Sequence, residues 1–222
     1  MTNSLLQHSH LRPLRDQVIL ITGAGKGSGR MLALAFAKHG AIVAANDISP
    51  VNVEEVVDQI IARGGRARAY IDDVAKKVAA QNIVNQVEDD FGQIDILVNH
   101  AAVEPHVPLL DMDEWDWHRV LDVNLTGAFL MTQSAGRVMR SRASGVIINL
   151  ITGSAREASS ARTEPGRSEA AFLASMQGLA EFTRQAAREL NPHGIQVHLV
   201  ENSPENVVKN VFALLDLQME DE

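Results

Sequence analysis

The sequence contains no cysteine, and this absence excludes several kinds of chemistry at once. There is no disulfide, no thiolate metal ligand and no thiol nucleophile, which fits the reducing conditions of the cytoplasm, where we expect the protein. No apolar run approaches the roughly 20 residues that a helix needs to cross a bilayer. Basic residues are also outnumbered, with 20 Lys and Arg against 28 Asp and Glu, which gives a formal net charge of -8. We therefore expect neither nucleic acid nor a membrane surface as a partner.

Tyrosine and lysine are rare as well. The only tyrosine is Tyr70, and the lysines are Lys26, Lys38, Lys76, Lys77 and Lys209. No tyrosine is therefore followed four residues later by a lysine anywhere in the chain. Histidine is more frequent, but no two histidines have a convincing ligand spacing, so the sequence predicts no metal site.

The sequence does contain a regular alternation of strand-like and helix-like segments. The predicted strands are residues 18–21, 41–45, 67–71, 94–98, 146–150 and 196–200. Apolar residues at helical spacing lie between them; in the first such segment Leu32, Ala33 and Phe36 form one face. This alternation predicts an α/β fold, a single doubly wound parallel sheet covered by helices on both faces. We place the domain at residues 16–217, between a loose arm (1–15) and a short acidic tail (218–222).

The end of the first predicted strand carries a glycine-rich loop. It reads Thr22-Gly23-Ala24-Gly25-Lys26-Gly27-Ser28-Gly29. Glycines let the backbone turn tightly and let a pyrophosphate approach the N-terminus of the following helix, where free N–H groups stabilise the anion. Alone, such a loop is weak evidence, because it can also be a simple turn. Its position between a strand and an amphipathic helix favours a nucleotide site.

An acidic residue ends the second predicted strand. Asp47 lies about 20 residues after the last glycine, where an acid accepts hydrogen bonds from the adenosine ribose. Such an acid also repels a 2′-phosphate, so this position favours NAD over NADP. The alternative is that Asp47 is a strand-end residue in the turn before Pro50. In this context we favour the ribose-binding role.

These motifs together resemble the short-chain dehydrogenase/reductase family from about Asp16 to Val200. The loop matches the family's Thr-Gly-x-x-x-Gly-x-Gly, Asp73-Val74 matches its adenine-contacting Asp-Val, and residues 115–126 match its long fourth helix. Asn99-His100-Ala101-Ala102 resembles Asn-Asn-Ala-Gly with two departures. The cofactor contacts that the resemblance implies are Gly23, Gly25, Lys26, Gly27, Ser28, Gly29, Asp47, Asp73, Val74, Asn99 and Ala101.

In active members of this family a tyrosine hydroxyl transfers the proton, and a lysine four residues later lowers its pKa and holds the nicotinamide ribose. Aligned backwards from residues 187–194, these two positions fall on Phe172 and Met176. A phenyl ring cannot donate a proton, and a thioether carries no charge. The family's catalytic serine falls on Thr152 and its catalytic asparagine on Asn124, which we regard as vestigial, with Asn124 retained to keep the fold.

The rest of the substrate side also departs from the family pattern. The interval from Thr152 to Phe172 is longer than usual, and Asn202-Ser203 stands where the family has Pro-Gly. The chain passes almost directly from Val200 into a helix predicted at 204–215. We therefore expect the helical substrate lid to be missing, and likewise the final edge strand marked by Val-Asp-Gly-Gly, which leaves about six strands.

Three interpretations of the sequence remain open. The first, which we favour, is a catalytically silent pseudoenzyme with a weakened NAD site. The second is an NAD-dependent oxidoreductase acting on 3-oxoacyl or sugar-alcohol substrates through Thr152 and Glu157 or Glu169, with His106 as another candidate acid or base. The third is a deliberately disabled variant.

The resemblance also implies an oligomer. In the family the fourth and fifth long helices, here about residues 112–139 and 168–190, commonly form a dimer bundle. We expect a homo-oligomer, with a hetero-oligomer that includes an active relative as the other possibility.

Overall fold

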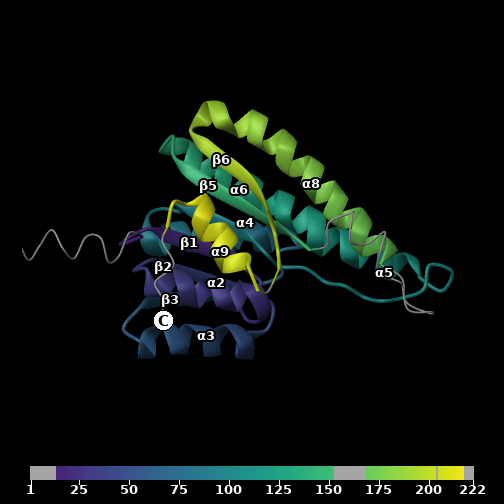
Figure 1. Ribbon diagram of the computed structural model, residues 1–222, viewed down its shortest axis with the longest axis horizontal. Coiled ribbons are helices and arrows are strands. Elements are labelled where there is room, and N and C mark those ends of the chain that lie inside the picture. Colours follow the sequence, from purple (N-terminus) through teal and green to yellow (C-terminus); the bar gives the residue numbers. More distant parts are fainter. Residues whose placement is uncertain (1–13, 153–168, 204, 218–222) are drawn as a thin grey trace, which may run out of the picture.

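The computed structural model describes residues 14–152, 169–203 and 205–217, and its described strands form one parallel sheet (Figure 1). The strand order is β3-β2-β1-β4-β5-β6. This arrangement confirms the predicted doubly wound α/β fold. The strands are β1 (Val18–Thr22), β2 (Ile42–Asp47), β3 (Arg66–Ile71), β4 (Ile96–Asn99), β5 (Gly145–Ile151) and β6 (Ile195–Glu201).

Helices cover both faces of the sheet (Figure 1). On one face lie α2 (Gly27–Lys38), α3 (Pro50–Ala62) and α9 (Val207–Leu214), and on the other α4 (Lys77–Phe91), α6 (Ala128–Ser141) and α8 (Ala170–Leu190). The central strands are apolar on both sides because each face is buried. In β1, Ile19 and Ile21 pack toward α2, whereas Val18 and Leu20 pack toward α4 and α6.

The helix predicted at residues 112–139 is one continuous helix that is interrupted in its middle by a π-helical turn. It consists of α5 (Glu114–Leu121), the π-helical turn η1 (Asp122–Gly127) and α6. A π turn widens the helix locally and often marks a functional site in proteins. It contains Asn124, whose side chain it directs toward the segment after β4.

A buried polar network ties the carboxyl ends of β4 and β5 to the covering helices. Asn99 donates to Asn149 (Nδ2 to Oδ1, 2.8 Å) and to Thr132 (Nδ2 to Oγ1, 3.1 Å). Asn149 in turn donates to Thr183 of α8 (2.8 Å). Because buried polar groups need partners, these bonds fix the positions of α6 and α8 relative to the sheet.

The passage from β6 to the last helix is short. β6 ends at Glu201 and α9 begins at Val207, so the connection has no room for a helical lid. Residues 153–168, which include the candidate Glu157, lie outside the described residues, as do most of the predicted arm and the acidic tail. Leu14, at the end of that arm, packs into the core and is 4% exposed.

Candidate nucleotide site

A cleft of about 240 Å³ lies at the carboxyl ends of the strands. It spans the boundary between β1 and β4, where the chain reverses the direction in which it adds strands. Open α/β sheets bind ligands at this switch point. The cleft is lined by Gly23, Lys26, Asn46, Asp47, Ile48, Asp72, Asp73, Val74, His100, Ala101, Ala102, Val103, Arg119, Val123, Leu150, Thr152, Met176 and Asn202.

The glycine-rich loop packs so closely against its neighbours that only glycine fits at several positions. A Cβ on Gly29 would lie 2.3 Å from the Gly23 carbonyl oxygen, and one on Gly23 would lie 2.9 Å from the Ala101 Cα. Gly23 and Gly27 also have positive φ angles, of 66° and 53°. Gly27 differs from the others because nothing lies within 4 Å of its Cβ position. Its surroundings are therefore open to an approaching group.

Helix α2 begins at this open position, and no side chain caps its N-terminus. The first N–H groups of an α-helix have no partner within the helix, and the helix dipole adds positive potential there. Lys26, at the cap position, adds a cation that lines the cleft. The geometry suits a pyrophosphate.

Asp47 is held in place from two sides. Its Oδ2 accepts a hydrogen bond from the Gly25 N–H (2.9 Å) and its Oδ1 accepts one from the Ser49 N–H (2.9 Å). The second bond is that of a turn-forming aspartate, so the turn interpretation of this residue is also met. Asp47 nevertheless lines the cleft, and each carboxylate oxygen has capacity for a further hydrogen bond.

The adenine side of the cleft carries an ion pair that sequence analysis missed. Arg119 of α5 lies 3.3 Å from the Asp73 carboxylate (Nη1 to Oδ2), whose other oxygen accepts from the Ala75 N–H. Arg119 lines the cleft beside Val74. No local pattern reveals this arginine, because its partner follows a different strand and only the fold brings the two together.

Thr22 joins the glycine loop to the end of β4. Its Oγ1 accepts hydrogen bonds from the backbone N–H groups of His100 (3.0 Å) and Ala101 (3.1 Å). The His100 ring donates through Nδ1 to the Gly23 carbonyl (3.1 Å). Burial lowers the pKa of His100 below its ordinary value of 6.5, so the ring is neutral at physiological pH.

Asn99 lies under the floor of the cleft. Its amide nitrogen points into the core network, while its Oδ1 is buried without a protein partner among the described residues. The neighbouring residue Ala101 lines the cleft itself. Asn99 therefore does not line the cleft itself; its side-chain hydrogen bonds anchor the backbone that carries the cleft-lining Ala101.

The positions expected to be catalytic are occupied as follows. Met176 and Thr152 both line the cleft, and the Thr152 hydroxyl accepts a hydrogen bond from Asn202 (3.3 Å). Phe172 is buried, 5% exposed, one turn earlier on α8. Asn124 lies behind the cleft, and together with Met176 and Ala101 it lines a much smaller cavity.

Both amide protons and the amide oxygen of Asn124 make hydrogen bonds within the protein. Its Oδ1 accepts from the Val103 N–H (2.8 Å), and its Nδ2 donates to the Val103 carbonyl and to the Ser175 hydroxyl (both 3.0 Å). Both amide protons are therefore committed, and none is left to orient a water molecule. These bonds fasten the segment after β4 to α8.

Tyr70 lies on β3, outside the residues that line the cleft. Its hydroxyl donates to Asp90 (2.7 Å) on α4. Burial and the bond to this carboxylate raise the pKa of Tyr70 far above its ordinary value of 10.0. It cannot replace the missing proton donor.

The comparisons with known proteins identify the family. The sequence profile of the short chain dehydrogenase family matches residues 17–207, so the chain belongs to this family of oxidoreductases. It is 36% identical over 187 residues to a (2S)-[(R)-hydroxy(phenyl)methyl]succinyl-CoA dehydrogenase subunit of Thauera aromatica, covering 84% of this chain and 72% of the relative. It is 37% identical over 188 residues to a 3-oxoacyl-[acyl-carrier-protein] reductase of Synechocystis, covering 84% and 73%.

Solved structures agree with the family assignment. A metagenomic short-chain oxidoreductase in complex with NADP superposes with a TM-score of 0.82 at 29% identity, covering 93% of both chains. NAD+-bound xylitol dehydrogenase superposes with a TM-score of 0.76 at 31% identity, covering 85% of this chain and 70% of that one. None of the helices in the described part of this chain is long and apolar enough to cross a membrane.

The buried, neutral His100 leads to a pH prediction. Its folded-state pKa lies below the value in the unfolded chain, so the unfolded state takes up a proton first as the pH falls through 6.5. We expect the free energy of unfolding to decrease from pH 7.5 to pH 5.5, and His100→Asn, the residue of the family pattern, to make this decrease smaller. Urea unfolding at several pH values measures it.

Two comparisons make this measurement specific. His193→Asn, which changes an exposed histidine between α8 and β6, should alter the pH dependence less than His100→Asn does. Some dependence should survive in His100→Asn, because burial also lowers the pKa of His198. An unchanged slope in His100→Asn would show that His100 is not kept neutral by the fold.

Proposed function

We propose that this chain keeps the adenosine and pyrophosphate half of an NAD site and lacks the proton-transfer chemistry of its family. The observation that carries the proposal is that α8 presents uncharged side chains, without a proton donor, at the two positions aligned with the family's lysine and tyrosine. Met176, at the position aligned with the family's lysine, is 2% exposed and lines the cleft with an uncharged side chain. Phe172, at the tyrosine position, is buried and has no proton to give.

Several features fit a bound dinucleotide. The space at Gly27 admits a phosphate that a Cβ would obstruct, and the uncapped N-terminus of α2 supplies the N–H groups to hold it. Asp47, Arg119 and Val74 all line the cleft, and in this proposal Asp47 binds the adenosine ribose while Arg119 and Val74 contact the adenine. A bound NAD would supply the hydride-transfer chemistry of the family, which this chain's own residues do not support with a proton donor.

The proposal extends to the choice and strength of binding. The Asp47 carboxylate favours ribose hydroxyls and repels a 2′-phosphate, although one structural neighbour is bound to NADP. Met176 provides no charge to grip the nicotinamide ribose. We therefore expect weaker NAD binding than in an intact relative, with ADP competing well.

A second candidate function is an oxidoreductase with non-standard catalytic groups. The observation in its favour is the Thr152 hydroxyl, which remains in the cleft. The relatives that are named as 3-oxoacyl reductases and the xylitol dehydrogenase suggest the substrate classes to assay. General acid–base assistance is typically worth ~10²–10⁴-fold in rate, so loss of the tyrosine favours the silent alternative.

Calorimetry tests the retained half-site through its nucleotide binding. We expect the protein to bind NAD and ADP and to bind NADP more weakly. Asp47→Asn should weaken NAD binding by about 10–100-fold, because hydrogen bonds to a charged group contribute about 1.5–3 kcal/mol. The same change should reduce the ratio of NAD affinity to NADP affinity. Asp58→Asn, an exposed change on α3, is the matched control. Failure to bind any of the three nucleotides contradicts the retained half-site.

Turnover assays test the loss of catalysis. In protein freed of host reductases we expect no oxidation of NADH with 3-oxoacyl thioesters and no reduction of NAD with sugar alcohols. Robust turnover would overturn the silent function. In that case Thr152→Ala and Glu169→Gln decide between mechanisms, since activity that survives both changes excludes a mechanism that depends on either side chain.

We also propose that the chain forms a homodimer through α5, α6 and α8, or pairs there with an active relative. Large apolar side chains are exposed on this side, including Trp115 (69%) and Phe129 (40%), and Phe129 packs edge-on against Phe182 of α8. We expect Phe129→Glu to weaken self-association in sedimentation velocity, whereas Val51→Glu, an exposed change on α3, should not. A wild-type monomer at all concentrations, alone and with an active relative, would refute this interface.

A further inference from the structure

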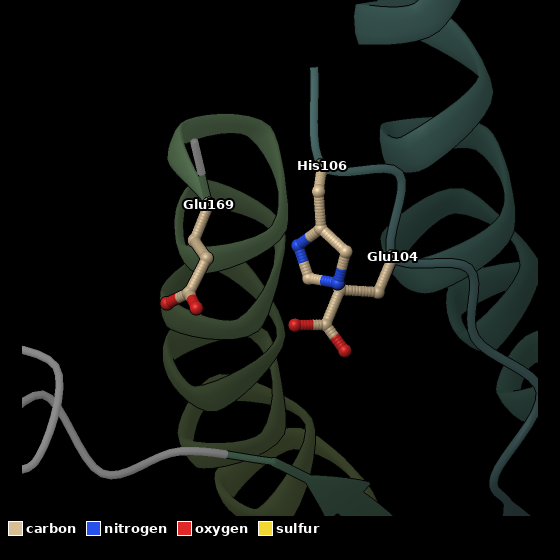
Figure 2. Close-up of side chains that lie close together, drawn as sticks. All are labelled: Glu104, His106 and Glu169. Carbon is tan, nitrogen blue, oxygen red and sulfur yellow. The ribbon is translucent and has the colours of Figure 1, made fainter. Parts of the chain in front are cut away.

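Three side chains with metal-ligating atoms come together next to the substrate end of the cleft (Figure 2). Glu104 and His106 lie in the segment after β4, directly beyond the cleft-lining Val103. Glu169 precedes α8, one turn before Phe172. One ligand atom from each lies within 4.8 Å of the other two.

The imidazole and the two carboxylates lie close together. Figure 2 shows one ring nitrogen of His106 on the side of Glu169 and the other toward Glu104. His106 Nδ1 is buried, and no group among the described residues makes a hydrogen bond to it. A buried polar atom without a partner costs about 1–3 kcal/mol, so most such atoms have a hydrogen-bond or metal partner, and none of the described residues provides one for His106 Nδ1.

From this arrangement we propose that Glu104, His106 and Glu169 bind a divalent transition-metal ion such as Zn²⁺ or Mn²⁺. One imidazole and two carboxylates form a donor set that suits these ions, and the two negative charges balance the ion's charge. Bonds of about 2.0–2.2 Å to each ligand require the donor atoms to lie about 3–3.5 Å apart. The three ligand atoms already lie within 4.8 Å of one another and Glu104 is exposed, so we expect side-chain rotation to bring them to bonding distance of the ion.

The site goes beyond the proposed nucleotide function and does not depend on it. Its ligands lie outside the residues that contact the adenosine and pyrophosphate side, so ion binding is measurable whether or not NAD binds. Three protein ligands leave at least one coordination position for water or another oxygen ligand. The spacing of histidines could not reveal the site, because it uses one histidine and two glutamates from distant segments.

The proposal is tested by titrating metal-stripped protein with Zn²⁺ in a calorimeter. All variants are made in a full-length background protein that carries His8→Asn and His10→Asn. These two histidines lie two residues apart in the sequence and can contribute Zn²⁺ binding of their own. We expect one ion per chain. Glu104→Gln, His106→Gln and Glu169→Gln should each weaken binding by at least about 10–100-fold, the loss that follows removal of even a group hydrogen-bonded to a metal ligand.

A matched control uses a histidine and a glutamate elsewhere. His118 and Glu114, an exposed pair on α5 (3.3 Å), should tolerate His118→Gln and Glu114→Gln with no change in Zn²⁺ affinity. Thermal unfolding gives a second measurement that separates ligand loss from misfolding. Saturating Zn²⁺ should raise the Tm of the background protein and of the control variants but not that of the three site variants, while all should unfold cooperatively without metal.

The outcomes are distinct. A stoichiometric ion that is lost in all three site variants and kept in both controls supports the site. Equal Zn²⁺ affinity in the background protein and the site variants overturns it, as does the absence of any binding to the background protein. A failure of NAD to bind leaves this result unaffected, so it can fail or hold separately from the proposed function.

Discussion

The close packing of the glycine loop against the end of β4 is the constraint on which the nucleotide half of the site depends. The Thr22 hydroxyl accepts two backbone N–H groups from β4's end, and the His100 ring bonds back to Gly23. A Cβ at Gly29 cannot be accommodated in this contact. Because the loop is held from both sides, the N-terminus of α2 and Asp47 are placed together by the fold itself, independently of any chemistry at α8.

The part of the cleft beside α8 depends on a different set of interactions. Asn124 uses its whole amide to join the segment after β4 to Ser175 of α8. The network of Asn99, Asn149 and Thr183 fixes the same helix from the sheet side. Such buried bonds are costly to lose, so they hold α8 in place whichever side chains it presents to the cleft. This explains how α8 keeps its position while carrying Phe172 and Met176.

Sequence reasoning predicted the sheet, and the place of the glycine-rich loop between a strand and a helix, because both rest on local patterns. Strands alternate with helices, and the glycines precede an amphipathic helix. It did not find Arg119, whose partner Asp73 lies on another segment, or the π turn around Asn124. Neither has a local signature, since each arises from contacts between segments that only the folded chain brings together. For the same reason the spacing of histidines predicted no metal site, whereas the fold brings His106 beside Glu169.

At the start of α8 the proposed metal ligand Glu169 lies close to the two positions where the family has its proton-transfer residues. In this helix the proton-transfer positions are one turn and two turns beyond Glu169. An uncharged, buried Phe172 and Met176 leave the carboxylate of Glu169 without a cation on its own helix face, because the first turn of α8 carries no basic residue. His106 approaches this carboxylate from the segment after β4, and its Nδ1 has no hydrogen-bond partner within the described part of the chain (Figure 2). The two carboxylates and this ring nitrogen form a donor set whose negative charge the proposed divalent cation would balance.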